Sequence, residues 1–430
     1  MTSTTDLLPE GFDDFTDPWL LEKGIPHEAF RRARQTSRMH WVEQQPGAAD
    51  GMSHVAGHGY WAVTRHEDVA AISKNSKDWS TEENGSIIRF SEGMTREQVE
   101  LQRVILLNQD PPHHTQHRSI ISRGFTPRSV NELEQLMTKR AHDIVAAAVA
   151  EGGGNFVDQV AAELPLQAIA DLIGVPQEDR HKLFDWSNRM IGVDDPAYNG
   201  DPADGSAAAA ELYIYANTLG AEKRAVPTDD IVSRLVNAEV DGDQLTDAEF
   251  DMFFLLLTVA GNETTRNATS LGVRALMEHP DQYAALQADR DLLGTAIEEM
   301  LRWATPVHHF RRIATTDTEL GGQAIAAGDK VVIWHASANR DEAVFDEPHR
   351  FDVRRDPNEH VAFGGGGPHF CLGANLARME LRLIFTEILD RMPDLEPVGT
   401  PEVLRSNFIH GITSMPVRFT PTPASTSVGV

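Results

Sequence analysis

The sequence predicts a mainly α protein with small β-sheets. Helical periodicity dominates its 430 residues, whereas strand patterns are short and few. No internal repeat and no regular alternation of strands with helices is visible, so a doubly wound parallel sheet is not expected. One segment also predicts a helix much longer than the usual three turns. We expect a flexible segment over residues 1–18, a single domain over 19–420 and a disordered tail over 421–430.

Two strands stand out. "YWAVT" (Tyr60–Thr64) alternates and is rich in β-forming residues. "KVVIWHA" (Lys330–Ala336) follows a Gly-Gly turn and an Ala-Ala-Gly turn. Both are typical of strands in a small sheet.

Three helices precede the longest one. Asn131–Ala150 is amphipathic and ends at "EGGG", and Pro176–Val193 begins with a proline. A loop rich in Gly, Pro and Asp (194–206) then leads to a helix over Ala207–Lys223. Two helices around such a loop suit a lid over a buried site, although a plain surface connection fits equally well.

The longest helix runs from Thr246 to His279. Thr246 and Glu249 form a capping box, and Pro280 ends the segment. At 1.5 Å per residue it spans about 50 Å. Its first half is apolar on every face, so we expect that half to be buried.

"AGNETT" interrupts this helix where the apolar run ends. Gly261 costs about 1 kcal/mol relative to alanine in a helix interior, and Glu263 is costly to bury ionised. In one interpretation the helix simply surfaces here with a polar face. In the other it passes through a buried site, where a small residue makes room for a ligand and an acid–alcohol pair, Glu263 and Thr264, relays protons.

Composition narrows the function classes. The net charge is −27, which argues against nucleic-acid binding through the overall field. A single cysteine excludes a disulfide framework, an iron–sulfur cluster and a multi-thiolate zinc site. No signal peptide is visible, and the most apolar stretch is too short to span a bilayer. We therefore expect a cytoplasmic protein.

The lone Cys371 lies in "FGGGGPHFCLGANLAR", between a glycine loop and a predicted helix. Most single cysteines are inert and buried, but a helix N-terminus favours a thiolate. The glycines do not match a nucleotide-binding pattern. Zinc held by Cys371, His369 and His360 has the wrong spacing and no evident fourth ligand. A metal that accepts one thiolate remains, and haem iron does so.

Several cations could bind the two propionates of a haem. His114 and Arg118 lie four apart on a helix begun by Pro111–Pro112, Arg312 follows in "HHFRR", and His369 precedes the cysteine. Alone, each is more often a surface charge, and "HHTQH" also fits a weak metal cluster. Separately, Glu299 and Arg302 at i, i+3 indicate an ion pair, either exposed or buried with Arg355 as a third member.

Taken together, the sequence resembles the cytochrome P450 superfamily over essentially its whole length. "AGNETT" is similar to the oxygen-activating motif of the long central helix, Glu299–Arg302 with Arg355 to the E-x-x-R network, and "HFCLG" to the haem-thiolate loop. The resemblance implies a triangular prism with the long helix over haem b. It makes Cys371 the iron ligand, Glu263 and Thr264 the catalytic pair, and the following residues haem contacts: His114, Arg118, Arg312, His369, Ala260, Gly261 and Phe363.

The loop departs from the family pattern in one place. The usual spacing puts a phenylalanine seven residues before the cysteine, but Gly364 holds that place and Phe363 lies one residue further back. The packing role of Phe363 is therefore open.

"STEENGSIIRF", "ISRGFTPRSV" and "RWATPVHHFRR" narrow the resemblance to actinobacterial steroid 26/27-monooxygenases. It implies hydroxylation of the terminal side-chain methyl of cholesterol or cholest-4-en-3-one, and further oxidation to the acid. Alternatives are a hydroxylase of another terpenoid, a branched-chain lipid or a secondary metabolite, a peroxygenase, and a haem sensor or carrier without turnover.

The implied partners are an apolar substrate, dioxygen, and a ferredoxin with its NAD(P)H-dependent reductase. We expect a monomer with no membrane span and no nucleic-acid partner. By position, we expect the substrate pocket to be lined by Ile87, Ile88, Val259, Val307, Phe408 and Ile412.

Overall fold

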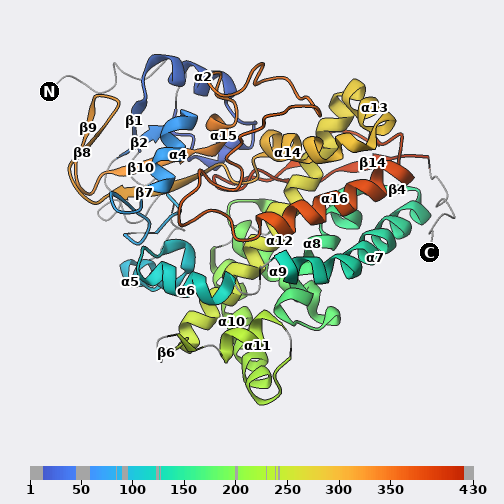
Figure 1. The fold of residues 1–430 in the computed structure, drawn as a ribbon, viewed down its shortest axis with the longest axis horizontal. Coiled ribbons are helices and arrows are strands. Elements are labelled where there is room, and N and C mark those ends of the chain that lie inside the picture. Colours follow the sequence, from blue (N-terminus) through green and yellow to red (C-terminus); the bar gives the residue numbers. More distant parts are fainter. Residues whose placement is uncertain are drawn as a thin grey trace.

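The structure, a computed structural model, describes residues 13–44, 59–83, 85–89, 95–122, 125, 127–198, 202–228, 230–237, 239–240 and 243–420. Helices make up most of it, and a small sheet lies to one side (Figure 1). The predicted tail over 421–430 lies outside the described residues, as does most of the predicted flexible segment. Within that segment, however, Phe15 is buried against the ring of Phe30, so its last residues are part of the fold.

The largest sheet has five strands in the order β1 (Met39–Glu43), β2 (Gly59–Val63), β10 (Lys330–Trp334), β7 (His309–Ala314) and β3 (Trp79–Ser80). β10 pairs parallel with β2, and the other pairs are antiparallel. Both strands that the sequence predicts are therefore present. The second is shorter than expected because α15 (His335–Ala338) begins directly after Trp334.

The remaining strands form small pairs and one group of three. They are β4 (Gly153–Asn155) with β14 (Pro416–Arg418) and β11 (Glu396–Pro397), β5 (Glu239–Val240) with β6 (Asp243–Gln244), β8 (Thr318–Leu320) with β9 (Gln323–Ile325), and β12 (Glu402–Val403) with β13 (Ile412–Ser414).

Helices connect and cover these strands. Besides α15 they are α1 (Pro18–Leu21), α2 (His27–Thr36), α4 (His66–Lys74), α5 (Arg96–Leu101), α6 (His113–Ser122), α7 (Pro127–Glu151), α8 (Glu163–Ile173), α9 (Arg180–Ile191), α10 (Pro202–Ala225), α11 (Ile231–Val236), α12 (Asp247–Glu278), α13 (Pro280–Ala288), α14 (Leu293–Ala304) and α16 (Ala374–Arg391). Single turns are η2 (Gln102–Val104), η3 (Leu106–Asn108), η5 (Val157–Ala161), η6 (Gln177–Asp179), η7 (Pro196–Tyr198) and η8 (Arg290–Leu292). None of the described helices combines the length and the apolar character that a membrane crossing needs.

The long helix α12 has 32 residues and starts at the predicted capping box. The Thr246 hydroxyl accepts from the Glu249 amide at 3.2 Å, and the Thr246 amide donates to the Glu249 carboxylate at 2.7 Å. The burial prediction is wrong in one respect. Met252, Leu255 and Val259 in the first half are only partly buried, because that face borders a cavity. The second half is the more buried one.

The two helices around the Gly/Pro/Asp loop are α9 and α10. α10 begins at Pro202, five residues earlier than Ala207, so the connection is shorter than the sequence predicts. Both helices pack against α12 and against each other. Val193, Asp194 and Pro196 of this connection line the cavity that α12 borders, and the lid stays a prediction.

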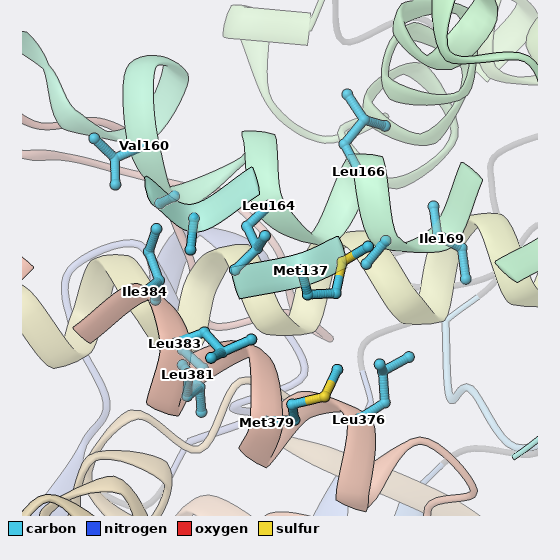
Figure 2. Close-up of a cluster of buried hydrophobic side chains, with 14 of the residues drawn as sticks. Met137, Val160, Leu164, Leu166, Ile169, Leu376, Met379, Leu381, Leu383 and Ile384 are labelled. Atoms are coloured by element: carbon cyan, nitrogen blue, oxygen red, sulfur yellow. The ribbon is translucent and has the colours of Figure 1, made fainter. Parts of the chain in front are cut away.

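The main core lies where α7, α8 and α16 meet α12. Figure 2 shows side chains from α7, α8 and α16 gathered in one cluster, including Met137, Leu164 and Ile384, which are 0–2 % exposed. α16 follows the cysteine loop directly, so this core fixes the element that carries Cys371 relative to the long helix.

Candidate active site

A cavity of about 1490 Å³ lies between α12 and the loop that carries Cys371. Trp19 and Leu101, both 58 % exposed, also line it, so it opens to the surface. Ligand pockets usually measure about 300–1,000 Å³. This cavity therefore has room for more than one small molecule.

The glycine loop is shaped by close contact with α4. Gly364, Gly366 and Gly367 have φ of +97°, +93° and +76°, a region that side chains rarely adopt. A Cβ at Gly365 would lie 2.7 Å from the Ala70 Cα, and one at Gly367 would lie 2.3 Å from the Ser73 carbonyl oxygen. The four glycines thus let the backbone coil tightly against a helix.

That coil delivers Cys371 to the cavity. Its amide donates to the Phe363 carbonyl at 2.9 Å. Cys371 is exposed, and it is one of the residues that line the cavity. Burial raises the pKa of the Cys371 thiol, against the opposing effects of the Gly373 amide, Arg118 and Arg378. The helix N-terminus alone does not make a thiolate here, contrary to the sequence interpretation, because desolvation outweighs it. A bound metal cation would deprotonate the thiol.

All four predicted propionate partners line the same cavity: His114, Arg118, Arg312 and His369. The rings of His114 and His369 lie 4.2 Å apart, and Arg118 donates to the Phe370 carbonyl at 2.6 Å. Burial lowers the pKa of Arg312 to about 10 and that of His114 to about 4. Anionic groups beside them would offset this desolvation.

His114 provides a specific indication of a ligand. It is 1 % exposed, and among the described residues neither ring nitrogen has a hydrogen-bond partner. Buried polar atoms normally have partners. One thiol and a group of guanidinium and imidazole groups in one cavity match the iron and the two carboxylates of a haem. The residues present therefore fit this cofactor.

The polar motif of α12 faces the cavity rather than the outer surface: Asn262, Glu263 and Thr265 are buried, and Ala260 and Thr264 have their accessible surface at the cavity. Thr264 donates to the Ala260 carbonyl at 2.8 Å, and both residues line the cavity. Gly261 also lines it, but a Cβ there would lie 2.8 Å from Ile169 on α8. The missing side chain therefore serves helix packing, rather than ligand space alone.

Glu263 is tied to α9 as well as to its own helix. It pairs with Arg266, and both side chains are 1 % exposed. Ser187 donates to Glu263 at 3.2 Å, and Arg266 donates to the Asn188 side chain at 2.8 Å. Burial raises the pKa of Glu263, and Arg266 opposes this rise. Glu263 and Thr264 thus lie in separate hydrogen-bond groups.

The predicted substrate-pocket residues divide into two sets. Ile87, Val259, Val307 and Phe408 line the cavity. Ile88 and Ile412 do not. Ile88 is 1 % exposed and belongs to a core cluster with Phe30, Tyr60 and Trp334, so its side chain is part of the core and not of the cavity wall. Ile412 belongs to β13, is fully buried, and donates from its amide to Asn267.

Glu299, Arg302 and Arg355 come together as a buried network. Arg302 donates twice to Glu299 at 2.8 Å, and Arg355 adds a bond at 3.1 Å. Arg302 also donates to the Asn339, Pro348 and Arg350 carbonyls. Each charge is satisfied, as a buried pair requires.

The zinc alternative does not fit. The His360 ring is hydrogen-bonded to Glu298 at 3.0 Å, whereas the His369 ring stacks on His114. Across the described residues, no three His, Cys, Asp or Glu side chains are arranged to hold a metal ion.

Sequence reasoning missed two buried polar residues at this site. Arg266 lies three residues after Glu263, the same spacing that pointed to Glu299–Arg302, so the pattern could have revealed it. Glu380 on α16 lines the cavity with one carboxylate oxygen unpartnered among the described residues, and burial raises its pKa to about 8. No spacing rule indicated this residue, because it lies within an ordinary amphipathic helix.

Comparison with known proteins gives consistent results. The cytochrome P450 family model matches residues 218–407. A steroid C26-monooxygenase of Rhodococcus jostii is 49 % identical over 96 % of this chain and 85 % of its own length. A methyl-branched lipid omega-hydroxylase of Mycobacterium tuberculosis is 42 % identical over 93 % of this chain and 92 % of its own.

Among solved structures, a cytochrome P450 of Mycobacterium marinum in complex with pseudoionone has a TM-score of 0.87 and 40 % identity, covering 96 % of this chain and 99 % of its own. Relatives this similar over nearly the full length establish that the chain belongs to the cytochrome P450 family, whose cofactor is haem.

Proposed function

We propose that this chain hydroxylates the terminal side-chain methyl of a sterol, with the iron of its haem held by Cys371. One observation carries the proposal: the same cavity is lined by Cys371, by the polar motif of α12 around Thr264, and by apolar residues that extend to the surface. The similarity to a steroid C26-monooxygenase supports this substrate class.

When bound, the haem supplies an iron at which dioxygen is activated with two electrons and two protons. His114, Arg118, Arg312 and His369 would hold its propionates. Ala260 and Thr264 of α12 also line the cavity and would border a substrate carbon bound there.

Glu263 and Thr264 would move protons toward the oxygen site. The Thr264 hydroxyl is bonded to the Ala260 carbonyl, so it can turn into the cavity at the cost of one hydrogen bond. Glu263 is bonded to Arg266 and Ser187, and it would have to leave one of them to deliver a proton. Movement of α9, which carries Ser187, would remove the Ser187 bond and leave Glu263 held by Arg266 of its own helix.

Apolar side chains would select the substrate. Ile87, Leu101, Val259, Val307 and Phe408 line the passage between the surface and α12. A long, rigid hydrocarbon buries its surface along such a passage, at roughly 25 cal/mol per Å². The electrons would come from a ferredoxin and its NAD(P)H-dependent reductase, acting in the cytoplasm.

A titration followed by the haem Soret band tests the substrate class. Cholest-4-en-3-one should shift the band toward the high-spin form, whereas macrolides should not. Turnover with NADH, a ferredoxin and its reductase should then give a product hydroxylated at the terminal methyl. The absence of both shift and product would remove the steroid proposal.

The 42 % identity to a lipid omega-hydroxylase favours one second candidate. A methyl-branched fatty acid in the same titration tests it. Tighter binding and faster turnover of that lipid than of the sterol would make it the preferred substrate.

A further inference from the structure

Three side chains support the cysteine loop from outside the cavity. They are Glu298 on α14, His360 in the segment before the loop, and Arg378 on α16, and we call them the Glu298 clamp. Arg378 donates to both carboxylate oxygens of Glu298 at 2.7 Å. His360, 2 % exposed, bonds to the same carboxylate at 3.0 Å. The clamp thus connects three segments that are far apart in the sequence.

In the Glu298 clamp, His360 connects the Glu298 carboxylate to the backbone before the cysteine loop. The Ala362 amide donates to His360 Nδ1 at 3.2 Å, so this nitrogen carries no proton. The other ring nitrogen, Nε2, must then hold the proton that it donates to Glu298. One neutral tautomer satisfies both contacts, and it anchors the backbone next to Phe363.

Arg378 connects the same carboxylate to the ring of Phe363. Its guanidinium carbon lies 4.6 Å from the centre of the Phe363 ring, a cation–π contact. The carbonyl of Phe363 accepts the amide proton of Cys371 at 2.9 Å. A continuous set of contacts therefore runs from Glu298 through Arg378 and Phe363 to the backbone of Cys371. It gives Phe363, whose position along the loop is unusual, a defined packing role.

The clamp also places charge beside the thiol. Arg378 packs against the ring of Phe363, and the carbonyl of Phe363 binds the Cys371 amide, so the guanidinium charge lies near the thiol. Glu298 is the anion paired with that guanidinium. Reduction of ferric to ferrous haem adds one electron, hence one negative charge, on the iron–sulfur unit. A nearby cation favours that charge and an anion opposes it. The two members of the pair must then act on the reduction in opposite directions.

We propose that the Glu298 clamp positions Phe363 and tunes the haem: Arg378 raises the reduction potential of the Cys371-ligated iron, and Glu298 lowers it. The proposal assigns positioning residues, since none of the three touches the reacting atoms. It depends on ligation of the haem by Cys371 and not on the identity of the substrate.

The test is a redox titration of the substrate-free holoenzyme with dithionite and mediator dyes. Glu298→Gln keeps the shape of the side chain and removes its charge, so the midpoint potential should rise. Arg378→Gln should lower it. Arg382→Gln is the matched control, because Arg382 lies one turn further along α16 and pairs with the exposed Glu134 at 2.6 Å, away from the loop. Its potential should equal that of the wild type.

A second readout separates tuning from simple loss of structure. The Soret band of the ferrous carbon monoxide complex reports whether the thiolate still ligates the iron. Opposite shifts in potential with an unchanged band support the proposal. Shifts in the same direction, or no shift in Glu298→Gln, overturn it. If Arg378→Gln fails to load haem, Arg378→Lys replaces it. This variant keeps the positive charge, so its midpoint potential should stay near that of the wild type. The potential of Glu298→Gln then decides the outcome.

Discussion

Removal of Arg266 should destabilise the protein strongly, because it leaves a buried carboxylate without its cation. Glu263 and Arg266 are each 1 % exposed, so little water contacts either side chain. Breaking a fully buried pair by removing one member costs about 3–5 kcal/mol. In Arg266→Met the Asn188 oxygen also loses its donor, which adds about 1–3 kcal/mol.

The cost should depend on pH. Burial already raises the pKa of Glu263, and Arg266 opposes the rise, so removing the arginine raises this pKa further. A carboxyl with a raised pKa in the folded state contributes no penalty below the unfolded value of about 4.3. Stability is then lost as the pH rises through the folded pKa. Arg266→Met should therefore be far less destabilised at pH 5 than at pH 8.

Urea unfolding of the holoenzyme, followed by circular dichroism, measures this effect. Glu263→Gln/Arg266→Met is the informative companion, because it removes the stranded charge. It should recover most of the stability that Arg266→Met loses at pH 8. A loss below about 1 kcal/mol in Arg266→Met, or no recovery in the double variant, would show that the pair is hydrated and that the reasoning is wrong.

Three further predictions concern the same cavity. Gly367→Ala should abolish haem loading, measured by absorbance, because its Cβ would lie 2.3 Å from the Ser73 carbonyl oxygen at a φ of +76°. In the wild type, the raised pKa of Glu380, about 8 in the folded state, should make the protein less stable as the pH rises from 4.5 to 8. Glu380→Gln should lack this loss of stability, and thermal melts at pH 6 and pH 9 check it. Thr264→Ala should leave the Soret titration unchanged but divert electrons to peroxide, measured as product formed per NADH consumed. Unchanged coupling would remove Thr264 from the proton path.

Local patterns were sufficient for the long helix and for the contact between Glu299 and Arg302, although they left open whether that pair is buried. The capping box at Thr246 and the stop before Pro280 are written in consecutive residues, and α12 follows them. Glu299 and Arg302 share one face of a helix, so their contact needs no knowledge of the rest of the fold. Such features depend on spacing along a single element.

Features that depend on tertiary contact were predicted less well. Ile88 was predicted to line the pocket by its position along the chain, but it belongs to the core cluster that contains Phe30 and Trp334. Glu380 lies in an ordinary amphipathic pattern, and only the fold reveals that this position borders the cavity. A sequence pattern shows which face of a helix or strand a side chain lies on, but it does not show which other element that face contacts.

The additional residue after Phe363 is one case in which only the fold shows how Cys371 is positioned. A longer loop would normally move Cys371 away from the carbonyl that its amide binds. Here Gly364, Gly366 and Gly367 adopt positive φ, and this coiling absorbs the extra length against α4. The Cys371 amide reaches the Phe363 carbonyl at 2.9 Å, and the Arg378 guanidinium packs against the Phe363 ring. The glycines and the Glu298 clamp thus position Cys371 together, because the glycines let the loop coil and the clamp fixes Phe363, where the coil begins.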